Sequence, residues 1–600
     1  MPFDSLTLAG LCTELNEKLT QARIHKIYQP RRDEITLVLR PREGSAIHLS
    51  ISANAVNARI HISEVHPENP KQAPAFCMLL RKYLEGTRVE SITQDGLDRV
   101  LQIHMLALND FREWEAKTLI CEFMGKHSNI LLVNPADGHI IDAIRRYSHE
   151  ISAYREVLPG KTYIAPPPQE KHDVREISAE DFSRLAWNLE NPGSLSNAAF
   201  QVLSGMSPAA AVHFCRACRL EPDMPAEECG AYEFRLLHQT ILQTVQKLTA
   251  AGQHTGYLLR VNGSYKDFAA YPLFPAKDKG KVIETESISA AATRFYAQKE
   301  ENLQIEQLRQ SMSRRLKAQL DKLCRKQHFQ NGDKAQAIRN EKYKTWGELL
   351  TAYAWQFKKG DTEAVLADFY TGENVIIQLD RRYTPIENAQ HFFKIYNKSR
   401  GTLLHLETLM AENQQEIDYL QNALLAIEQA ESVRELSEIR LEMEKQGYLK
   451  AAAEKSRKPV KEQKLPPRRF LSSDGLPILV GRNSVQNDWL VRHAASSDLW
   501  LHTKEIASSH VILPLPHEIA SINDVPDNTL LEAAMLCAYY SQGRSGNKVP
   551  VDYTFIRNVK KPAGAKPGLV IYENCWTLLV DPHSDAMAAL LARRQDDAEQ

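Results

Sequence analysis

The chain has 600 residues, and at roughly 150 residues per domain it should form about four units rather than one core. Its 43% hydrophobic and 25% charged residues are ordinary for globular proteins and exclude wholesale disorder. The 74 Lys and Arg residues nearly cancel the 75 Asp and Glu residues, so only the local distribution of charge can indicate a partner. No stretch approaches the roughly 20 apolar residues that span a bilayer, and neither a signal peptide nor a disulfide framework is evident. We therefore expect a cytoplasmic protein with no membrane partner.

Residues 1–172 are predicted to form a mixed α/β domain. Leucines near helical spacing predict a helix over residues 4–22. After it, β-branched runs predict strands at residues 34–40, 46–51, 99–105 and 129–133. The three prolines at residues 166–168 then mark the expected end of the domain.

Residues 173–275 are predicted to form a helical unit that contains a helix-hairpin-helix. The sequence LSGMSPAAA at residues 203–211 places Gly205 in a tight turn before a helix of small residues. Such a hairpin points backbone N–H groups and a helix N-terminus at a nucleic-acid phosphate. A helix-turn-helix packing corner explains the same residues, and that alternative stays open. Cys215 and Cys218 form a lone CxxC, which we interpret as small buried hydrophobic residues on a helix rather than as zinc ligands.

An antiparallel coiled-coil arm is predicted from two segments with helical periodicity, residues 276–345 and 399–454. The second segment carries a heptad seam with one polar position. This seam consists of Met410, Asn413, Ile417, Leu420, Leu424 and Ile427. Between the two helices, residues 346–398 form a small inserted domain, because Gly347, Gly360, Gly372 and Pro385 divide them into short elements. Two core helices of a bundle are the alternative.

The remaining chain divides into a basic linker at residues 455–469, an α/β domain at residues 470–583 and a polar tail at residues 584–600. Basic residues are concentrated in that linker, between residues 309 and 344, and between residues 544 and 566. A phosphate backbone is the counter-charge that suits three such stretches in a neutral protein, since its neutralisation releases counterions. The charge distribution therefore favours nucleic-acid binding.

Several longer motifs then resemble the NFACT family of ribosome quality control factors, in order along nearly the whole chain. In the first domain they are FCMLLRK at residues 76–82, DR at 98–99, MGKHSNI at 124–130 and LPG at 158–160. In the insert the motif is ENAQ at residues 387–390, and in the last domain they are GRN at 481–483, DLWLHTK at 498–504 and VPVDYT at 549–554. The resemblance implies a glycosylase-like mixed α/β N-terminal domain and an α/β RNA-binding C-terminal domain.

The resemblance also implies an activity. Members of the family bind stalled large ribosomal subunits that carry peptidyl-tRNA, and they recruit tRNA for untemplated C-terminal tailing of the nascent chain. In bacteria the recruited species is alanine tRNA. Peptide-bond formation belongs to the ribosome, so we expect positioning rather than catalysis: no enzyme, no catalytic residue, no cofactor and no metal. The expected partners are the large subunit, its rRNA and tRNA, while the oligomeric state stays open.

The expected tRNA-binding residues lie in the first domain. The resemblance assigns tailing to Asp98 and Arg99, and Arg offers a planar fork to phosphate or base edges. Without the resemblance, the pair would be an ordinary strand entry with a surface ion pair. Lys126, His127 and Asn129 follow a Gly-containing turn that could meet RNA, or that could be a structural turn with His127 satisfied internally.

The expected RNA-binding or ribosome-binding residues of the last domain centre on an alternating motif. Asp498, Trp500 and His502 would face one side of a strand, where an aromatic ring and a hydrogen-bonding His suit base stacking. A buried Trp with two polar anchors is the alternative. The other residues of this set are Arg482, Asn483, His510, Arg557, Lys560 and Lys561.

Two other functions compete with this interpretation. The first domain of the family is related to DNA glycosylases that use an N-terminal proline amine, and Met1-Pro2 would supply one. However, the acidic sequence and the C-terminal zinc finger of those enzymes are absent. A surface fibronectin-binding adhesin is the third class, and it is disfavoured because no secretion signal or wall anchor is recognised.

Overall fold

The protein is described by a computed structural model. Its described residues are 3–65, 67–108, 113–150, 152, 154–167, 169–252, 254–276, 280–450, 465–519 and 521–595. They form two compact units, Met1–Glu300 and Glu301–Gln600, each of which is taken by itself below. Within these described stretches, no helix combines the length and the apolar character that a membrane span requires.

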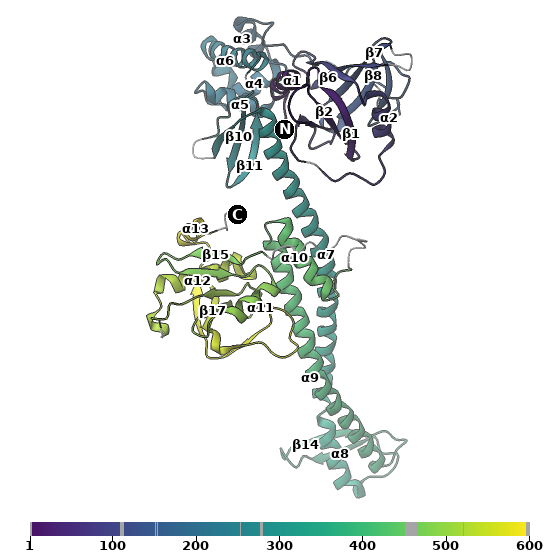
Figure 1. The fold of residues 1–600 in the computed structure, drawn as a ribbon. Coiled ribbons are helices and arrows are strands. Elements are labelled where there is room, and N and C mark those ends of the chain that lie inside the picture. Colours follow the sequence, from purple (N-terminus) through teal and green to yellow (C-terminus); the bar gives the residue numbers. More distant parts are fainter. Residues whose placement is uncertain are drawn as a thin grey trace. The chain divides into compact units, whose positions relative to one another are not determined.

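A nine-stranded antiparallel sheet dominates the first unit, in the order β4-β3-β2-β1-β5-β6-β7-β8-β9 (Figure 1). Helix α1 (Ser5–Leu19) buries its leucines against it, and α2 (Ala75–Leu84) packs beside β1. The strands are β1 (Arg23–Arg31), β2 (Glu34–Arg40), β3 (Ile47–Ser52), β4 (Arg59–Ile62), β5 (Arg88–Gln94), β6 (Val100–Leu108), β7 (Trp114–Glu122), β8 (Asn129–Asn134) and β9 (His139–Ala143). The helix and the four strands predicted for this domain are confirmed.

Four helices follow, α3 (Ala179–Trp187), α4 (Leu195–Val202), α5 (Pro208–Ala217) and α6 (Ala231–Thr249). The predicted hairpin joins α4 to α5. Gly205 has φ of +74° in the turn, and Ser207 caps α5 by accepting a hydrogen bond from the Ala210 N–H. Cys215 is buried in α5, and burial raises the pKa of its thiol to about 12, as expected for a small hydrophobic residue.

The helices of this unit end with α6 at Thr249, before residue 275. After α6 the chain forms β10 (Gly256–Val261) and β11 (Ser264–Ala269), which pair with β12 (Lys281–Thr285) in a three-stranded sheet. The turn between β10 and β11 is Asn262-Gly263, with φ of +48° and +79°. Asn-Gly is a strong signal for a tight hairpin, because both residues tolerate positive φ.

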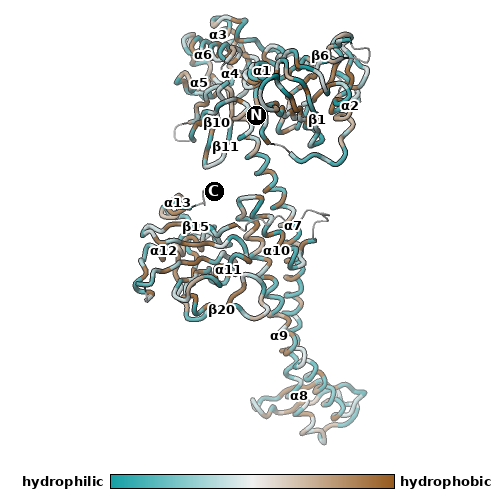
Figure 2. Tube along the Cα trace, in the orientation of Figure 1, coloured by the Kyte–Doolittle hydropathy of each residue, from teal (hydrophilic) through white to brown (hydrophobic). Residues whose placement is uncertain are grey.

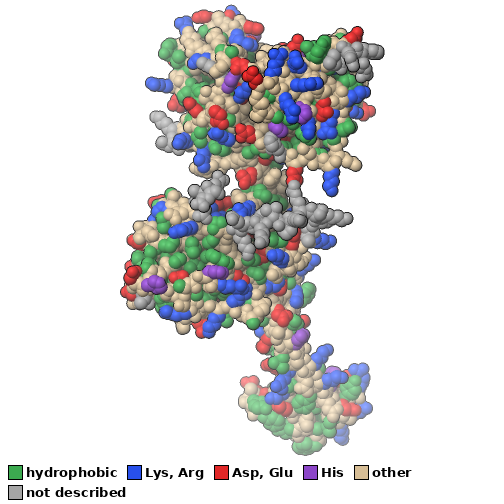
Figure 3. Space-filling view, in the orientation of Figure 1, with side chains coloured by type: hydrophobic (Ala, Val, Ile, Leu, Met, Phe, Trp, Pro, Cys, Tyr) green, Lys and Arg blue, Asp and Glu red, His purple; other side chains and the backbone are tan. Residues whose placement is uncertain are grey.

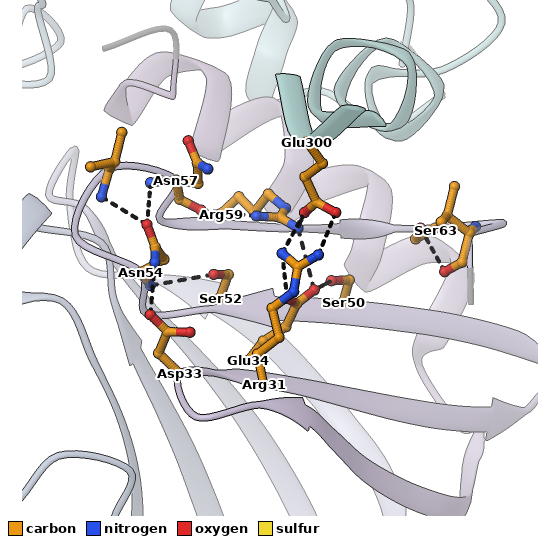
Figure 4. A network of polar contacts seen from close by, with 12 residues as sticks. Arg31, Asp33, Glu34, Ser50, Ser52, Asn54, Asn57, Arg59, Ser63 and Glu300 are labelled. Atoms are coloured by element: carbon orange, nitrogen blue, oxygen red, sulfur yellow. Dashed lines mark hydrogen bonds and ion pairs between the residues drawn. The ribbon is translucent and has the colours of Figure 1, made fainter. Parts of the chain in front are cut away.

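The first turns of α7 (Ile288–Arg339) belong to the first unit, where ion pairs attach them to the sheet (Figure 4). The Arg31 guanidinium donates to both carboxylate oxygens of Glu300, at 3.0 and 2.8 Å. Arg59 donates to Glu300 at 2.7 Å and to Glu34 at 3.3 Å. Arg59 and Glu34 are buried, so this network is less exposed to screening by salt than a surface ion pair.

In the second unit, α7 pairs with α9 (Pro385–Gln429) as the predicted antiparallel coiled coil. Arg309 donates to the carbonyl of Ile427 and Asn340 donates to Ser399, so the two helices run in opposite directions. Midway, the buried Asn413 side chain donates to the carbonyl of Leu323 at 3.1 Å. Figure 2 shows hydrophobic and hydrophilic residues interspersed along both helices, as the predicted seam requires.

Both boundaries of the second coil helix differ from the prediction of residues 399–454. The helix starts at Pro385, because Thr384 and Glu387 form a capping box and proline fits the first helical position. It ends at Gln429, and after a short turn Ser432 caps a separate helix, α10 (Val433–Lys445). The insert is smaller than predicted and consists of α8 (Lys342–Ala352), β13 (Glu363–Ala367) and β14 (Asn374–Gln378).

A six-stranded antiparallel sheet forms the last domain, in the order β15-β16-β18-β17-β19-β22. Its strands are β15 (Arg468–Leu471), β16 (Pro477–Val480), β17 (Leu499–Thr503), β18 (Val511–Leu513), β19 (Val549–Phe555) and β22 (Trp576–Val580). A two-stranded ribbon, β20 (Val559–Lys560) and β21 (Ile571–Tyr572), precedes β22. The helices are α11 (Ser484–His493), α12 (Asp527–Tyr539) and α13 (Asp585–Ala592).

The segments that flank this domain differ from the prediction where they are described. Most of the basic linker, residues 455–464, lies outside the described residues, while its last two residues, Arg468 and Arg469, belong to β15. The expected polar tail begins with α13, whose Met587 and Leu590 are buried in the domain core. Residues 596–600 lie outside the described residues.

Candidate functional site

The hairpin and the Asp98-Arg99 pair, which were predicted separately, meet in the first unit. A Cβ atom at Gly205 would lie 3.0 Å from Leu97 Cβ and 3.3 Å from the Leu97 carbonyl oxygen, so only glycine allows this close packing. Residues from both segments line one cavity of about 270 Å³. The hairpin therefore stands beside the pair that the resemblance assigns to tRNA.

Mixed charge lines this cavity. Burial raises the pKa of the Asp98 carboxyl, and Asp95 adds to the rise while Arg99 opposes it. Burial lowers the pKa of the Lys171 ammonium, with a further contribution from Arg99. Lys171 donates to the carbonyl of Phe200 at 2.6 Å and lies 3.8 Å from the centre of the Phe200 ring. Acceptor and donor groups thus stand next to an aromatic surface.

A larger groove of about 1180 Å³ shares Asp98 and Gln169 with this cavity. Its lining is rich in basic residues, and Figure 3 shows Lys and Arg side chains gathered over β1, β2 and β6–β8. The basic and aromatic residues are Arg32, Lys126, His127, Arg145, Arg146, Tyr147, Tyr154 and Arg155. We call this the basic groove.

Lys126 and His127 are exposed in the groove on a short 3-10 helix, Gly125–His127. Among the described residues, neither Arg32 nor Lys126 forms an ion pair. The Arg145 side chain donates to the Lys126 carbonyl at 3.1 Å and lies 3.7 Å from Asp33. Arg32 and Lys126 are therefore the lining cations without an ion pair among the described residues, whereas Arg145, Arg146 and Arg155 each pair with a carboxylate.

Asn129 does not reach the groove, which corrects its expected role. Its side chain is buried, donates to the Arg145 carbonyl at 2.9 Å and accepts from the Arg145 N–H at 3.1 Å. Because all of these atoms are engaged inside the protein, Asn129 cannot contact tRNA in this conformation. Its role is to hold the segment that carries Arg145.

A buried ion pair supports the opposite wall of the groove. Arg155 donates to both carboxylate oxygens of Glu122, at 2.7 and 2.6 Å, and Tyr163 donates to the same carboxylate at 3.0 Å. Arg155 also donates to the carbonyl of Ile164 at 2.7 Å. These bonds tie the segment that carries the exposed Tyr154 to strand β7.

Several lining residues were not found from the sequence. Asp4 faces the smaller cavity, and its carboxylate accepts from Ser207 at 3.1 Å and from Tyr271 at 2.7 Å. Arg32, Arg145 and Tyr154 belong to separate turns that no local motif connects, so only the folded sheet brings them together. Met1 and Pro2, on which the DNA lyase alternative depends, lie outside the described residues.

The expected base-stacking residue of the last domain belongs to its core. Trp500 is 0% exposed, and its ring stacks on His502 at a centroid distance of 5.6 Å. His510 meets it edge-on at 5.3 Å, and Tyr572 lies at 4.8 Å. Burial lowers the pKa of His502 to about 4 and places that of His510 well below its usual value. Trp500 is therefore the buried tryptophan of the alternative interpretation, and its prediction as an RNA contact is corrected.

Most other residues predicted for this domain are used internally. Asp498 accepts from the N–H groups of Ala495 and Leu515. Asn483 caps α11, and Lys561 pairs with Asp488. The Arg482 guanidinium lies 2.6 Å from Glu435 of α10.

Arg557 and Lys560 are the exceptions in that set. Both are exposed, and neither has an ion pair among the described residues. The Arg557 guanidinium lies 4.2 Å from the centre of the Phe555 ring, which holds it at the surface.

Two descriptions of known protein families match consecutive parts of the chain. The description "NFACT N-terminal and middle domains" matches residues 4–463, and "NFACT protein RNA binding domain" matches residues 467–574. The fold and these matches define a multidomain protein with an RNA-binding domain. The chain belongs to the NFACT family.

Curated relatives match over almost the whole chain. The Rqc2 homolog RqcH of Bacillus subtilis is 34% identical over 98% of this chain and all of its own length. The Rqc2 homolog RqcH of Streptococcus suis is 33% identical over the same shares. Among solved structures, the N-terminal part of a fibronectin/fibrinogen-binding protein from Streptococcus suis is 29% identical, covers 49% of this chain and 99% of its own, and has a TM-score of 0.39.

Proposed function

We propose that this protein acts in the cytoplasm as a ribosome-associated quality control factor. It binds stalled large ribosomal subunits that carry peptidyl-tRNA and recruits tRNA, in bacteria alanine tRNA, for untemplated tailing of the nascent chain. The proposal is supported by full-length similarity to RqcH proteins and by the RNA-binding domain.

The observation that carries the proposal is the basic groove beside Asp98 and Arg99. The exposed Arg32 and Lys126, which form no ion pair among the described residues, suit a phosphate backbone, and exposed aromatic rings such as Tyr154 suit unstacked bases. Asp98 can accept from a base amino group, and Arg99 can donate to phosphate or base edges. The groove thus combines backbone binding with a small number of groups for discrimination.

In this proposal the protein positions its partners, and ribosomal RNA forms the peptide bond. Holding a tRNA acceptor end against the stranded peptidyl-tRNA lowers the barrier by removing the entropy cost of encounter. The coiled-coil arm supplies reach, and the exposed cations along α7 offer a second surface to rRNA. No group on this chain needs to exchange a proton or form a covalent bond.

The first test is a pull-down of the tagged protein from its host, followed by sequencing of the bound RNA. Enrichment of large-subunit rRNA together with one dominant tRNA supports rescue and tailing and identifies the added amino acid. Large-subunit rRNA without a dominant tRNA supports binding without tailing. Absence of RNA above a mock pull-down would overturn the ribosomal proposal.

A second test separates binding from tailing. Asp98→Ala combined with Arg99→Ala should leave co-sedimentation with large subunits intact and abolish tail addition, measured by mass spectrometry of stalled nascent chains. Deletion of the arm should instead abolish stable co-sedimentation. Asp95→Ala is a matched control, because Asp95 is exposed one turn away and does not line the groove. Normal tailing by the double variant would remove Asp98 and Arg99 from the site.

A further inference from the structure

In the second unit, the RNA-binding domain (residues 465–595) is held against the arm (residues 301–449) by ion pairs. Each pair joins a cation of the domain to a glutamate of α9, α10 or the turn between them. Lys566 lies 2.6 Å from Glu416, and Arg594 donates to both oxygens of Glu431 at 3.0 and 2.7 Å. Arg482 and the buried Arg468 share Glu435, at 2.6 and 3.0 Å. We call these four contacts the glutamate latch.

The latch is not accompanied by a shared hydrophobic core. Among the described residues, the core of the arm runs from Ile305 to Leu449, whereas the two cores of the domain lie between Phe470 and Leu590. No hydrophobic cluster contains residues of both. Domains that meet through polar contacts rather than a large apolar interface move relative to each other as a rule. The contact is therefore suited to opening.

A pocket at the same interface shows that its apolar part is incompletely packed. It measures about 680 Å³ and lies between α10 and α11. Leu441 from the arm and Val485 and Trp489 from the domain line it, and each of the three side chains is at least 41% exposed. An interface that leaves these residues open contributes less apolar burial than a packed domain contact.

The latched cations are the groups that an RNA ligand of this domain would use. Arg482 belongs to the GRN motif of the RNA-binding domain, and Lys566 lies in the basic stretch between residues 544 and 566. Both are largely covered in the latched state, with side-chain exposures of 11% and 22%. A glutamate carboxylate and a phosphate oxygen accept from the same kind of donor, so the two compete for these cations.

We infer that the glutamates of the arm compete with RNA phosphates for Arg482, Lys566 and Arg594, so that RNA binding releases the RNA-binding domain from the arm. The latched form is an autoinhibited state, and RNA is the ligand that opens it. Since closing of the latch and RNA binding are linked, closing must weaken RNA binding by the same factor by which bound RNA weakens closing. This inference rests on the proposed RNA-binding function and concerns its regulation.

The test compares variants of the full chain by fluorescence anisotropy with a labelled single-stranded RNA oligonucleotide. Glu416→Gln combined with Glu431→Gln removes two latch pairs but keeps Glu435, the partner of the buried Arg468. This variant should bind the RNA about tenfold more tightly than the wild type. Glu444→Gln is the matched control, since Glu444 pairs within α10 with Arg440 at 2.9 Å, and it should bind like the wild type.

Opening is measured with fluorescent labels on the two exposed cysteines, Cys324 of the arm and Cys575 of the domain, after the partly exposed Cys12 and Cys218 are changed to Ser. Addition of RNA should lengthen the distance between the labels in the wild type. The double Glu→Gln variant should show the longer distance without RNA. Lys566→Gln should also open the latch, yet it should weaken RNA binding, because it removes a cation that RNA needs.

The outcomes separate the inference from the proposed function. If all variants bind the RNA with equal affinity and the distance between the labels does not change when RNA is added, the latch has only a structural role. The inference is then overturned, while the proposed RNA binding still stands. If no form binds RNA, the proposed function fails and the inference falls with it. Tighter binding by the double variant together with RNA-dependent opening of the wild type supports both.

Discussion

Contacts to RNA were predicted from sequence motifs both in the first unit, where the structure forms the basic groove, and in the RNA-binding domain of the second, yet the two regions use these residues differently. In the groove, Arg32, Lys126 and His127 face solvent. In the RNA-binding domain, Trp500 is buried and Arg482 is paired with Glu435. Lys126 and His127, predicted for the groove, are exposed, whereas most of the residues predicted for the RNA-binding domain form contacts within the protein.

The difference shows what a family motif can and cannot indicate. A DLWLHTK sequence is explained by a core in which Trp500 packs with two His rings as well as by a surface that needs a stacking platform. Only burial distinguishes the two. A motif therefore locates a constrained site, while the structure decides whether the constraint is packing or binding.

The largest expected effect is the loss of stability when Trp500 is replaced with Ala. The variant removes a fully buried ring and should destabilise the RNA-binding domain by about 3–5 kcal/mol. Chemical denaturation followed by near-ultraviolet circular dichroism measures this loss. Trp576→Ala is the control, because Trp576 is 41% exposed and should cost much less. If the two variants are equally stable, Trp500 is not part of the domain core and must be assigned to the surface.

The next effect concerns RNA affinity at the groove. Asp98→Asn with Arg99→Gln should weaken binding of a cognate tRNA about thirtyfold or more, because two base-edge contacts worth about 1–3 kcal/mol each are lost. Filter binding at fixed salt measures it. Lys561→Gln should change the affinity less than twofold, since Lys561 is already paired with Asp488. A reversed order of these two effects would place the tRNA site in the second unit.

A smaller effect is the acid sensitivity of the RNA-binding domain. The pKa of His502 is about 4 in the folded state, whereas an unfolded His titrates near 6.5. As the pH falls, the unfolded chain therefore binds this proton before the folded chain does. The free energy of unfolding should decrease by about 2 kcal/mol as the pH drops from 6.5 toward 4. Hydrogen exchange of strand β17 against pH measures it. A His502→Gln variant should lose the part of this dependence that belongs to His502, while His510, whose pKa is also lowered by burial, keeps its own part.

The smallest effect is a change in salt dependence. Lys126→Gln should lower the slope of log affinity against log salt by about 1, because one phosphate contact is lost. Arg146→Gln should lower it less, since Arg146 already pairs with Asp142 at 2.6 Å. An unchanged slope for Lys126→Gln would exclude this residue from phosphate binding.

Much of the fold was accessible from local sequence signals. The leucine spacing of α1, the β-branched runs of β2 and β8, and the seam of α9 each report a face that is buried by its immediate neighbours. The hairpin before α5 was equally local, because Gly205 and Ser207 act within one turn. Such features depend on periodicity and capping, which the sequence contains directly.

The rest depends on contacts between distant residues. Nothing near Asn129 indicates that its amide would hold Arg145, and nothing near Arg482 indicates a glutamate of α10 as its partner. Pro385 was misjudged for a different reason, because proline both breaks helices and begins them. The capping box around Thr384 was the signal that separates these two roles.

The buried Asn413 in the coiled coil has a consequence for how the arm changes length. Its hydrogen bond to the Leu323 carbonyl fixes which residues of α7 and α9 face each other, and a slipped pairing leaves a polar amide among leucines. Insertions or deletions preserve this register only as whole heptads, matched on both helices. The length of the arm from Ile305 to the insert can therefore change only in steps of about 10 Å, which is the length of one heptad.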